Sequence, residues 1–258
     1  MDFFSTTIMK IVGSYGMVTT FAVLGIMTII ATYLSKNVLK GRIDPSALAV
    51  IMALILAYIG GAATGGKRGI SDVTFFAGMG FVGGGMWLNY TLIATAYGAK
   101  LEELKKAGLA GGLALVVGTI IAFVVGALAA YAAGYRDAVS LTTIGAGAAT
   151  FAVGPVTGAA LGATSDVIAL SIAAGVVKSV SVMILTPFLA KPFGLTTPAA
   201  AMVYGGLVGT TSGTSAGLAA TDARLVPYGA TTATFYTGFG CLVCPSIGYF
   251  AVLALTGG

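Results

Sequence analysis

Charged residues are almost absent from the long stretch between Ala107 and Gly258. The whole chain of 258 residues is 8% charged, whereas a water-soluble domain carries about 25%. So few charges cannot cover a surface that faces water, so the chain is predicted to be an integral membrane protein. The seven charged residues of this stretch are Arg136, Asp137, Asp166, Lys178, Lys191, Asp222 and Arg224.

Six apolar runs are long enough to cross a membrane as helices, which takes about 20 residues. Pro45 stands just before the second run, where proline favours the start of a helix. The third run contains the stretch GMGFVGGGMW and is expected to bend or break near Gly83–Gly85. The chain is thus predicted to be all-α, with about six transmembrane helices. The runs are 11–34, 46–64, 74–97, 107–133, 166–190 and 226–255.

Two small, polar phrases interrupt the apolar C-terminal half. They read GPVTGAALGATSD at 154–166 and TSGTSAGLAATD at 211–222. The second phrase has the same pattern as the first and begins 57 residues after it, so that Thr214 corresponds to Thr157. The two final aspartates also correspond if the alignment is shifted by one residue. Glycine and proline disfavour a straight helix, so each phrase indicates a break.

We expect each phrase to form a re-entrant hairpin, two half-helices joined inside the membrane. The hairpins would span 138–165 and 198–222, with their breaks at Gly154–Gly158 and Thr210–Ser215. Irregular backbone is tolerated at this depth only where it is buried in protein or lines a wet cavity. One full span separates the hairpins, so they enter from opposite sides and the two hairpin-plus-span units form an inverted repeat, as in secondary transporters.

The repeat predicts two functional parts. Residues 1–134 would form a scaffold of four spans, and residues 135–258 a transport core made of the two repeat units. Lys and Arg are enriched in cytoplasmic loops. With the loops 35–45 and 98–106 placed inside, eight of these residues lie inside and four outside, which predicts an N-terminus outside the cell.

The breaks offer the groups that bind a small charged solute. Free N–H groups at half-helix N-termini suit a carboxylate, and hydroxyl and unwound carbonyl oxygens suit sodium. Small residues also allow helices to pack closely, but two phrases in matching positions favour a site. The predicted substrate-binding residues are Thr157, Gly158, Lys178, Ser212, Gly213, Thr214 and Ser215.

Lys178 lies near the middle of the run 166–190. A lysine at a helix centre costs about 2.5–3.5 kcal/mol on insertion scales, so it should face a cavity, a counter-ion or a substrate. Asp222 is a better partner than Asp166, which lies about 18 Å away along the same helix. Contact with substrate or ion and structural pairing both stay open.

Asp166, Asp222 and Thr211 are the candidate ligands of a coupling ion. Each aspartate follows a hairpin and precedes a span, so it could instead cap a helix. The chain has no histidine, and the CLVC pair at Cys241 and Cys244 lacks the second pair that a zinc site requires. We therefore expect no enzyme, no cofactor or metal beyond sodium, and no nucleic acid partner.

Long phrases of the sequence resemble MadM, the larger subunit of bacterial malonate transporters. They include GAKLEELKKAGLAGGLALVVG, AMVYGGLVGTTSG and GLAATDARLVPYGATTATFYTGFGC, and the likeness runs over nearly the whole chain. The resemblance implies malonate uptake across the bacterial cytoplasmic membrane, coupled to sodium or protons. It also implies a small membrane subunit, MadL, as partner, with a higher oligomer of the heterodimer.

The mechanism and one alternative function are further hypotheses from the sequence. By analogy with other hairpin transporters, the hairpin unit would move as an elevator against the early spans. The alternative from another class is the membrane subunit of an ion-pumping carboxylic-acid decarboxylase, which shares hairpin-like polar phrases.

Overall fold

The computed structural model forms two compact units, Met1–Ala94 and Thr95–Gly258. The predicted span at 74–97, with its bend near Gly83–Gly85, lies almost entirely outside the residues that the structure describes. The described residues are 15–41, 43–65 and 101–257, with the single positions 7, 73, 76, 90 and 93.

The first unit contains a pair of long helices in contact with each other. They are α2 (Gly16–Tyr33), which a π-helical turn η1 (Leu34–Val38) extends, and α3 (Pro45–Thr64). Asp44 caps α3 by accepting a hydrogen bond from the Ser46 amide at 2.8 Å. Both helices are long and apolar enough to cross a membrane, as predicted.

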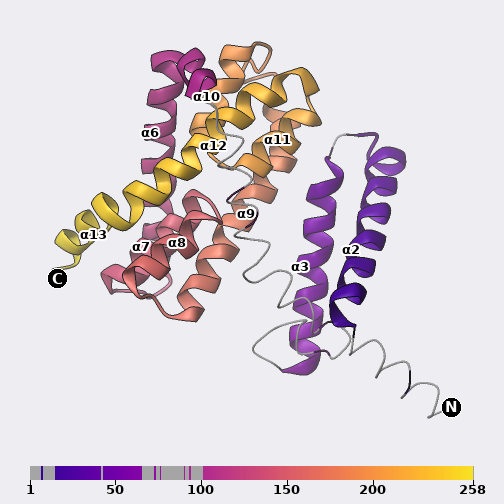
Figure 1. Ribbon diagram of the computed structural model, residues 1–258, viewed down its shortest axis with the longest axis horizontal. Coiled ribbons are helices and arrows are strands. Elements are labelled where there is room, and N and C mark those ends of the chain that lie inside the picture. The colour runs from indigo at the N-terminus through magenta and orange to yellow at the C-terminus, as the bar shows by residue number, and fades with distance from the viewer. Residues whose placement is uncertain are drawn as a thin grey trace. The chain divides into compact units, whose positions relative to one another are not determined.

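The second unit combines long and short helices (Figure 1). Its long helices are α6 (Leu101–Ala132), α9 (Ser165–Leu189) and α12 (Val226–Val243), which continues through η6 (Cys244–Gly248) into α13 (Tyr249–Thr256). With the pair in the first unit, they supply the five candidate membrane spans of the described residues. Its short helices are α7 (Ala138–Ala149), α8 (Val153–Leu161), α10 (Pro198–Val208), α11 (Thr211–Ala219) and the 3-10 turn η5 (Ala223–Leu225).

The first pair of short helices, α7 and α8, breaks earlier in the chain than predicted. The break is at Thr150–Ala152, and the expected position, Gly154–Gly158, is helical. Pro155 is the third residue of α8. A proline is tolerated there because the first turn of a helix has no internal partner for its N–H groups. The proline therefore marks the start of the second helix and not the break.

The second pair, α10 and α11, breaks at Gly209 and Thr210. Only the first residue of the predicted break, Thr210–Ser215, is non-helical. Thr210 caps α11, because its hydroxyl accepts a hydrogen bond from the Gly213 amide at 3.3 Å. This cap starts the helix at Thr211 and makes the rest of the polar phrase helical.

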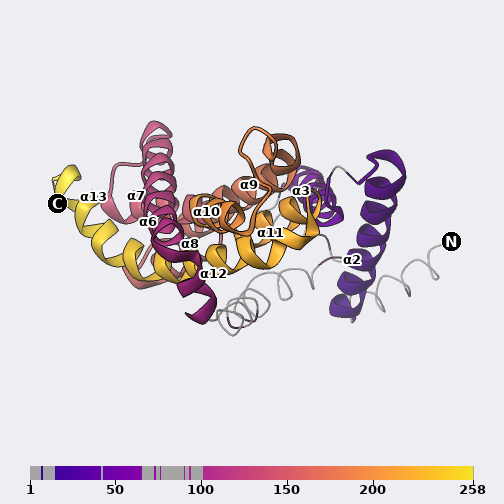
Figure 2. The same cartoon turned by 90° about the horizontal axis from the view of Figure 1, so that it is seen from above.

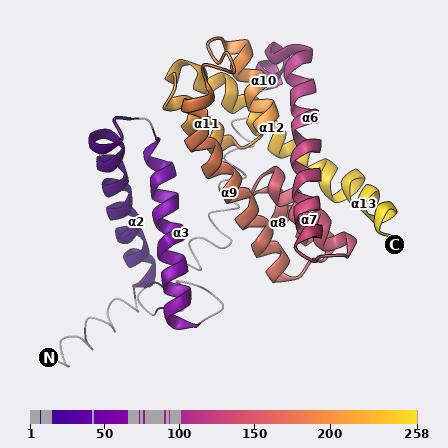
Figure 3. The ribbon, with the colours of Figure 1, turned by 180° about the vertical axis from the view of Figure 1, so that it is seen from behind.

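Helix α9 is the element on which both pairs meet. Its buried face carries Ser171, Gly175 and Ser179 at a spacing of four residues. A Cβ on Gly147 of α7 would lie 2.2 Å from the Ser171 carbonyl oxygen, and one on Gly213 of α11 would lie 2.9 Å from the Ser179 carbonyl oxygen. Figures 1 and 3 show α7 and α8 at one end of α9, and α10 and α11 at the other.

The two pairs pack on their long helices in the same register, 58 residues apart. Just as Gly147 meets the Ser171 carbonyl, a Cβ on Gly205 of α10 would lie 2.1 Å from the Gly229 carbonyl oxygen of α12. Both members of the second contact lie 58 residues after those of the first. Buried Val167, Ser171, Gly175 and Ser179 correspond in the same way to buried Leu225, Gly229, Ala233 and Thr237.

The two long helices run in opposite senses. Helix α9 starts beside α7 and α8 and ends towards α10 and α11, whereas α12 starts beside α10 and α11 and its extension α13 ends against α7. Figure 2 shows α12 and α13 as one long, bent rod. Each end has its own apolar core. One contains Phe123, Leu141, Ile144 and Val153, and the other Leu195, Tyr204, Leu218 and Leu225.

Candidate substrate and ion site

Both breaks reach the middle of α9. At the first break, a Cβ on Gly175 would lie 2.2 Å from the Phe151 amide nitrogen, so the break lies directly on this glycine. At the second, the hydroxyl oxygens of Thr210 and Ser179 are 2.5 Å apart. Gly175 and Ser179 are about one helical turn apart. The two breaks therefore meet around a single turn of α9.

Lys178 lies on this turn, partly buried. Its Nζ donates a hydrogen bond to the carbonyl oxygen of Ala149, the last residue of α7, at 2.7 Å. The same Nζ is 3.5 Å from the Tyr236 hydroxyl and 5.1 Å from the centre of that ring. The carbonyl end of a helix carries negative partial charge, so it stabilises the ammonium group.

Tyr236 connects this lysine to two other elements. Its side chain is completely buried, and its hydroxyl donates to the Gly118 carbonyl of α6 at 3.1 Å. The ring lies against Gly209 of the second break, where a Cβ would come within 2.3 Å of it. Gly209 also has a φ of +71°, which glycine adopts without strain. Tyr236 thus fixes α6, α12 and the second break around Lys178.

The structure brings some of the predicted binding residues near this centre. Gly213 lies against the Ser179 carbonyl, whereas Ser212 is exposed and Ser215 is partly buried. Gly158 packs on Ile168 of α9. Their predicted roles as ligands stay predictions.

Three of the predicted threonines have hydroxyl groups with unusual surroundings. The hydroxyl oxygens of Thr157, Thr211 and Thr214 are buried without a hydrogen-bond partner among the described residues. Leaving a buried hydroxyl unpaired costs about 1–3 kcal/mol. A ligand or a water molecule is the natural way to complete such groups, and Thr157 and Thr214 occupy matching positions in the two sequence phrases.

The two aspartates lie at the ends of α9 and α12, away from Lys178. Asp166 is exposed in the first turn of α9. Asp222 forms a bidentate ion pair with Arg224, with N–O distances of 2.8 Å and 3.0 Å. The hydrogen bonds from Arg224 hold the pKa of the Asp222 carboxyl below its ordinary value. Asp222, the better candidate partner for Lys178, is thus bound by Arg224, and Lys178 bonds the Ala149 carbonyl instead.

Ser179 and Tyr236 were not among the residues predicted from the sequence. Tyr236 follows Lys178 by 58 residues, which is the spacing at which the two helix pairs repeat their packing. The two residues thus occupy equivalent places on α9 and α12 and touch each other. Comparison of the long helices at this spacing, in addition to the polar phrases, would have indicated Tyr236.

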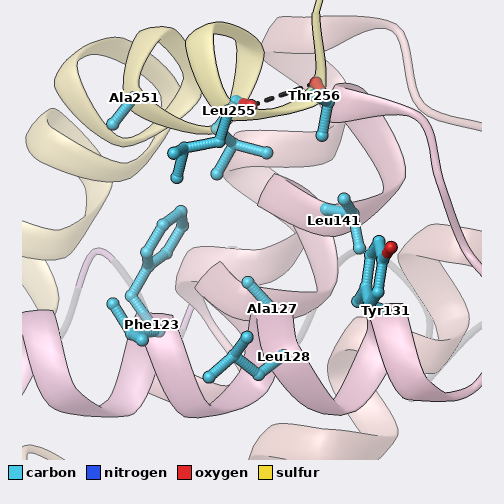
Figure 4. A pocket seen from close by; sticks show the side chains of 10 residues that line it. Phe123, Ala127, Leu128, Tyr131, Leu141, Ala251, Leu255 and Thr256 are labelled. Carbon is cyan, nitrogen blue, oxygen red and sulfur yellow. Dashed lines mark hydrogen bonds between the residues drawn. The ribbon is translucent and has the colours of Figure 1, made fainter.

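A separate hollow of about 340 Å³ lies between α6, α7 and α13 (Figure 4). Among the residues that the structure describes, no charged residue lines it, and the Thr256 hydroxyl is turned to its own helix, donating to the Val252 carbonyl at 3.0 Å. Such a surface suits hydrocarbon and offers a carboxylate no partner. Its lining includes Phe123, Ala127, Leu128, Tyr131, Leu141 and Leu255.

Comparison with known proteins identifies a family. No curated protein and no solved structure matches the chain. One family model, that of the malonate/sodium symporter MadM subunit, matches residues 8–256, nearly the whole chain. This family is a transporter subunit and not an enzyme, which confirms the prediction of no enzyme. The match agrees with the membrane-spanning helices and with the phrases quoted above, and the chain belongs to the malonate/sodium symporter MadM subunit family.

Proposed function

We propose that the chain is the larger subunit of a secondary transporter that takes up malonate across the bacterial cytoplasmic membrane, coupled to sodium or protons. The family match supports the substrate and the symport. The observation that carries the proposal is the meeting of two helix breaks on Lys178 of α9. Transporters bind solutes at such discontinuous helices near the membrane midplane.

Malonate has two carboxylates, and each needs a partner in a medium of low dielectric constant. One carboxylate would contact the Lys178 ammonium. The other would accept hydrogen bonds from the start of α11, where the first N–H groups have no partner within the helix. Thr210 accepts hydrogen bonds from the Gly213 and Thr214 amides, so the earlier N–H groups of α11 and the Thr211 hydroxyl would be available to the second carboxylate.

The short helices act, in this proposal, as two re-entrant hairpins of an inverted repeat. Helix α7 has 12 residues and α10 has 11, which gives lengths of about 18 Å and 16 Å. Each crosses little more than half of a hydrocarbon core of about 30 Å. The common spacing of 58 residues and the opposite senses of α9 and α12 support two related, inverted units.

Transport would follow an elevator mechanism with a scaffold in residues 1–134 and a core in residues 135–258. The small subunit MadL would complete the scaffold, in a higher oligomer of the heterodimer, with the N-terminus outside the cell. The family description as a subunit supports a partner. The buried glycine contacts of α7 and α10 on α9 and α12 support movement of the hairpins as one body.

Uptake by reconstituted protein tests the proposed function. The chain and its small partner would be placed in liposomes, and labelled malonate would be followed under an imposed sodium gradient. A second set would receive a proton gradient in sodium-free buffer. Accumulation driven by either gradient, without any soluble decarboxylase subunit, is the expected result. No accumulation under either gradient would overturn the proposal.

A further inference from the structure

The carbonyl ends of α7 and α10 differ in one respect. The last carbonyl groups of any helix have no partner within it, and inside a membrane water does not supply one. At the end of α7, the Ala149 carbonyl receives the Lys178 ammonium at 2.7 Å. A positive charge from the protein therefore stabilises the negative end of this helix dipole.

At the end of α10 the equivalent positions hold no such charge. Leu207 and Tyr236 lie 58 residues after Ala149 and Lys178, and the Tyr236 hydroxyl donates to the Gly118 carbonyl instead. The Gly209 amide bonds the Gly205 carbonyl at 2.9 Å. Beyond this bond, none of the described turn, loop or side-chain donors reaches the carbonyls of residues 206–208.

The carbonyl end of α10 lies against α6, and a pair of buried hydroxyl groups lies at the break that follows it. The Leu207 carbonyl oxygen is 2.4 Å from the position that a Cβ on Gly118 would take, so it points at α6. Thr210, three residues further on, holds its hydroxyl 2.5 Å from that of Ser179, and both side chains are buried. Carbonyl and hydroxyl oxygens at the negative end of a helix are the ligands that sodium takes in transporters.

We propose that the coupling sodium ion binds at the end of α10, on the Leu207 carbonyl and the hydroxyls of Ser179 and Thr210. The ion would neutralise the carbonyl end of α10, just as the Lys178 ammonium neutralises the carbonyl end of α7. The inference rests on the proposed function and assigns the cation to the second helix pair, which leaves Lys178 for a carboxylate. The Lys178 ammonium and the transported sodium ion would together balance the two negative charges of malonate.

Sodium binding without malonate tests this assignment. The complex of the chain with its small partner would be purified, and its unfolding temperature measured while NaCl replaces choline chloride at constant ionic strength. The wild type is expected to unfold at a higher temperature as sodium rises. Ser179→Ala should raise the half-saturating sodium concentration by at least about tenfold, because even outer-shell partners of a bound metal contribute that much. Ser179→Cys should give the same loss, since sulfur is a poor ligand for a hard cation.

Ser171→Ala is the matched control. Ser171 lies on the same buried face of α9, two turns earlier, and its hydroxyl donates to the Ile168 carbonyl at 2.7 Å. This variant should keep the sodium dependence of the wild type. Unchanged half-saturation in both Ser179 variants, or an equal loss in Ser171→Ala, would overturn the assignment. Gradient-driven malonate uptake by the wild type would still leave the proposed function standing, whereas no uptake under either a sodium or a proton gradient would overturn that function.

Discussion

Replacement of Lys178 by methionine separates a substrate contact from a structural pairing. The change removes the ammonium group and keeps the length of the side chain. It breaks the 2.7 Å bond to the Ala149 carbonyl and the contact with Tyr236. If Lys178 binds malonate, the variant should fold normally and lose malonate affinity.

The magnitudes follow from the surroundings of the ammonium group. A hydrogen bond to a charged group contributes about 1.5–3 kcal/mol, and a lysine at the centre of a membrane helix costs about 2.5–3.5 kcal/mol. Loss of the bond and relief of this cost nearly cancel, so the free energy of unfolding should change by no more than about 2 kcal/mol. The lost contact with a carboxylate should weaken malonate binding about 10- to 150-fold.

The assay combines two measurements on the purified complex. Thermal unfolding gives the stability, and its shift with added malonate gives the affinity. Lys191→Met, at an exposed lysine just after α9, is the control and should match the wild type in both. A Lys178→Met protein with wild-type malonate affinity and markedly reduced stability would refute the binding role and establish a structural one.

Two further predictions concern the repeat and the surface ion pair. Gly147→Ala and Gly205→Ala should each lower the free energy of unfolding by about 1–3 kcal/mol, because each Cβ would meet a backbone carbonyl oxygen within 2.2 Å. Gly112→Ala, with open space around its Cβ, should raise the free energy of unfolding by about 0.5–1 kcal/mol. Equal changes in the thermal unfolding of all three alanine variants would contradict this packing. Hydrogen bonds from Arg224 hold the pKa of the Asp222 carboxyl below its ordinary value of 3.8. The ion pair therefore stabilises the fold fully above pH 3.8, and this stabilisation is lost only as the pH falls through the lowered pKa. Asp222→Asn should therefore leave the pH profile of malonate uptake unchanged between about pH 5 and about pH 8, and a shifted profile in that range would argue for a proton-carrying role.

The sequence predicted the long helices and the two polar interruptions well. Length and apolarity alone define a membrane helix, so the five candidate spans, the last of which runs from η5 through α12 to α13, lie near the predicted positions. The exact breaks were harder to predict. Both second helices start earlier than predicted, because Pro155 is accommodated in the first turn of α8 and Thr210 caps α11. Each break therefore lies N-terminal to its predicted position.

The partners of Lys178 could not be read from the sequence. Its hydrogen bond goes to a backbone carbonyl 29 residues away. Every residue has such a carbonyl, so residue types do not indicate which one accepts the bond. Asp222 was therefore the better charged candidate in the sequence, but Arg224 binds both of its carboxylate oxygens. The hydroxyl pair of Ser179 and Thr210 likewise depends on how α11 packs on α9, which no local pattern reveals.

Malonate protection of engineered cysteines tests most directly the claim that both breaks bind one malonate. Cys241 and Cys244 would be replaced by alanine, and single cysteines introduced as Phe151→Cys at the first break and Thr211→Cys beside the second. Ser181→Cys, on the exposed side of α9, serves as the control. Malonate should slow maleimide labelling at both breaks and leave the control unchanged. Protection at only one break, or at neither, would contradict a shared site.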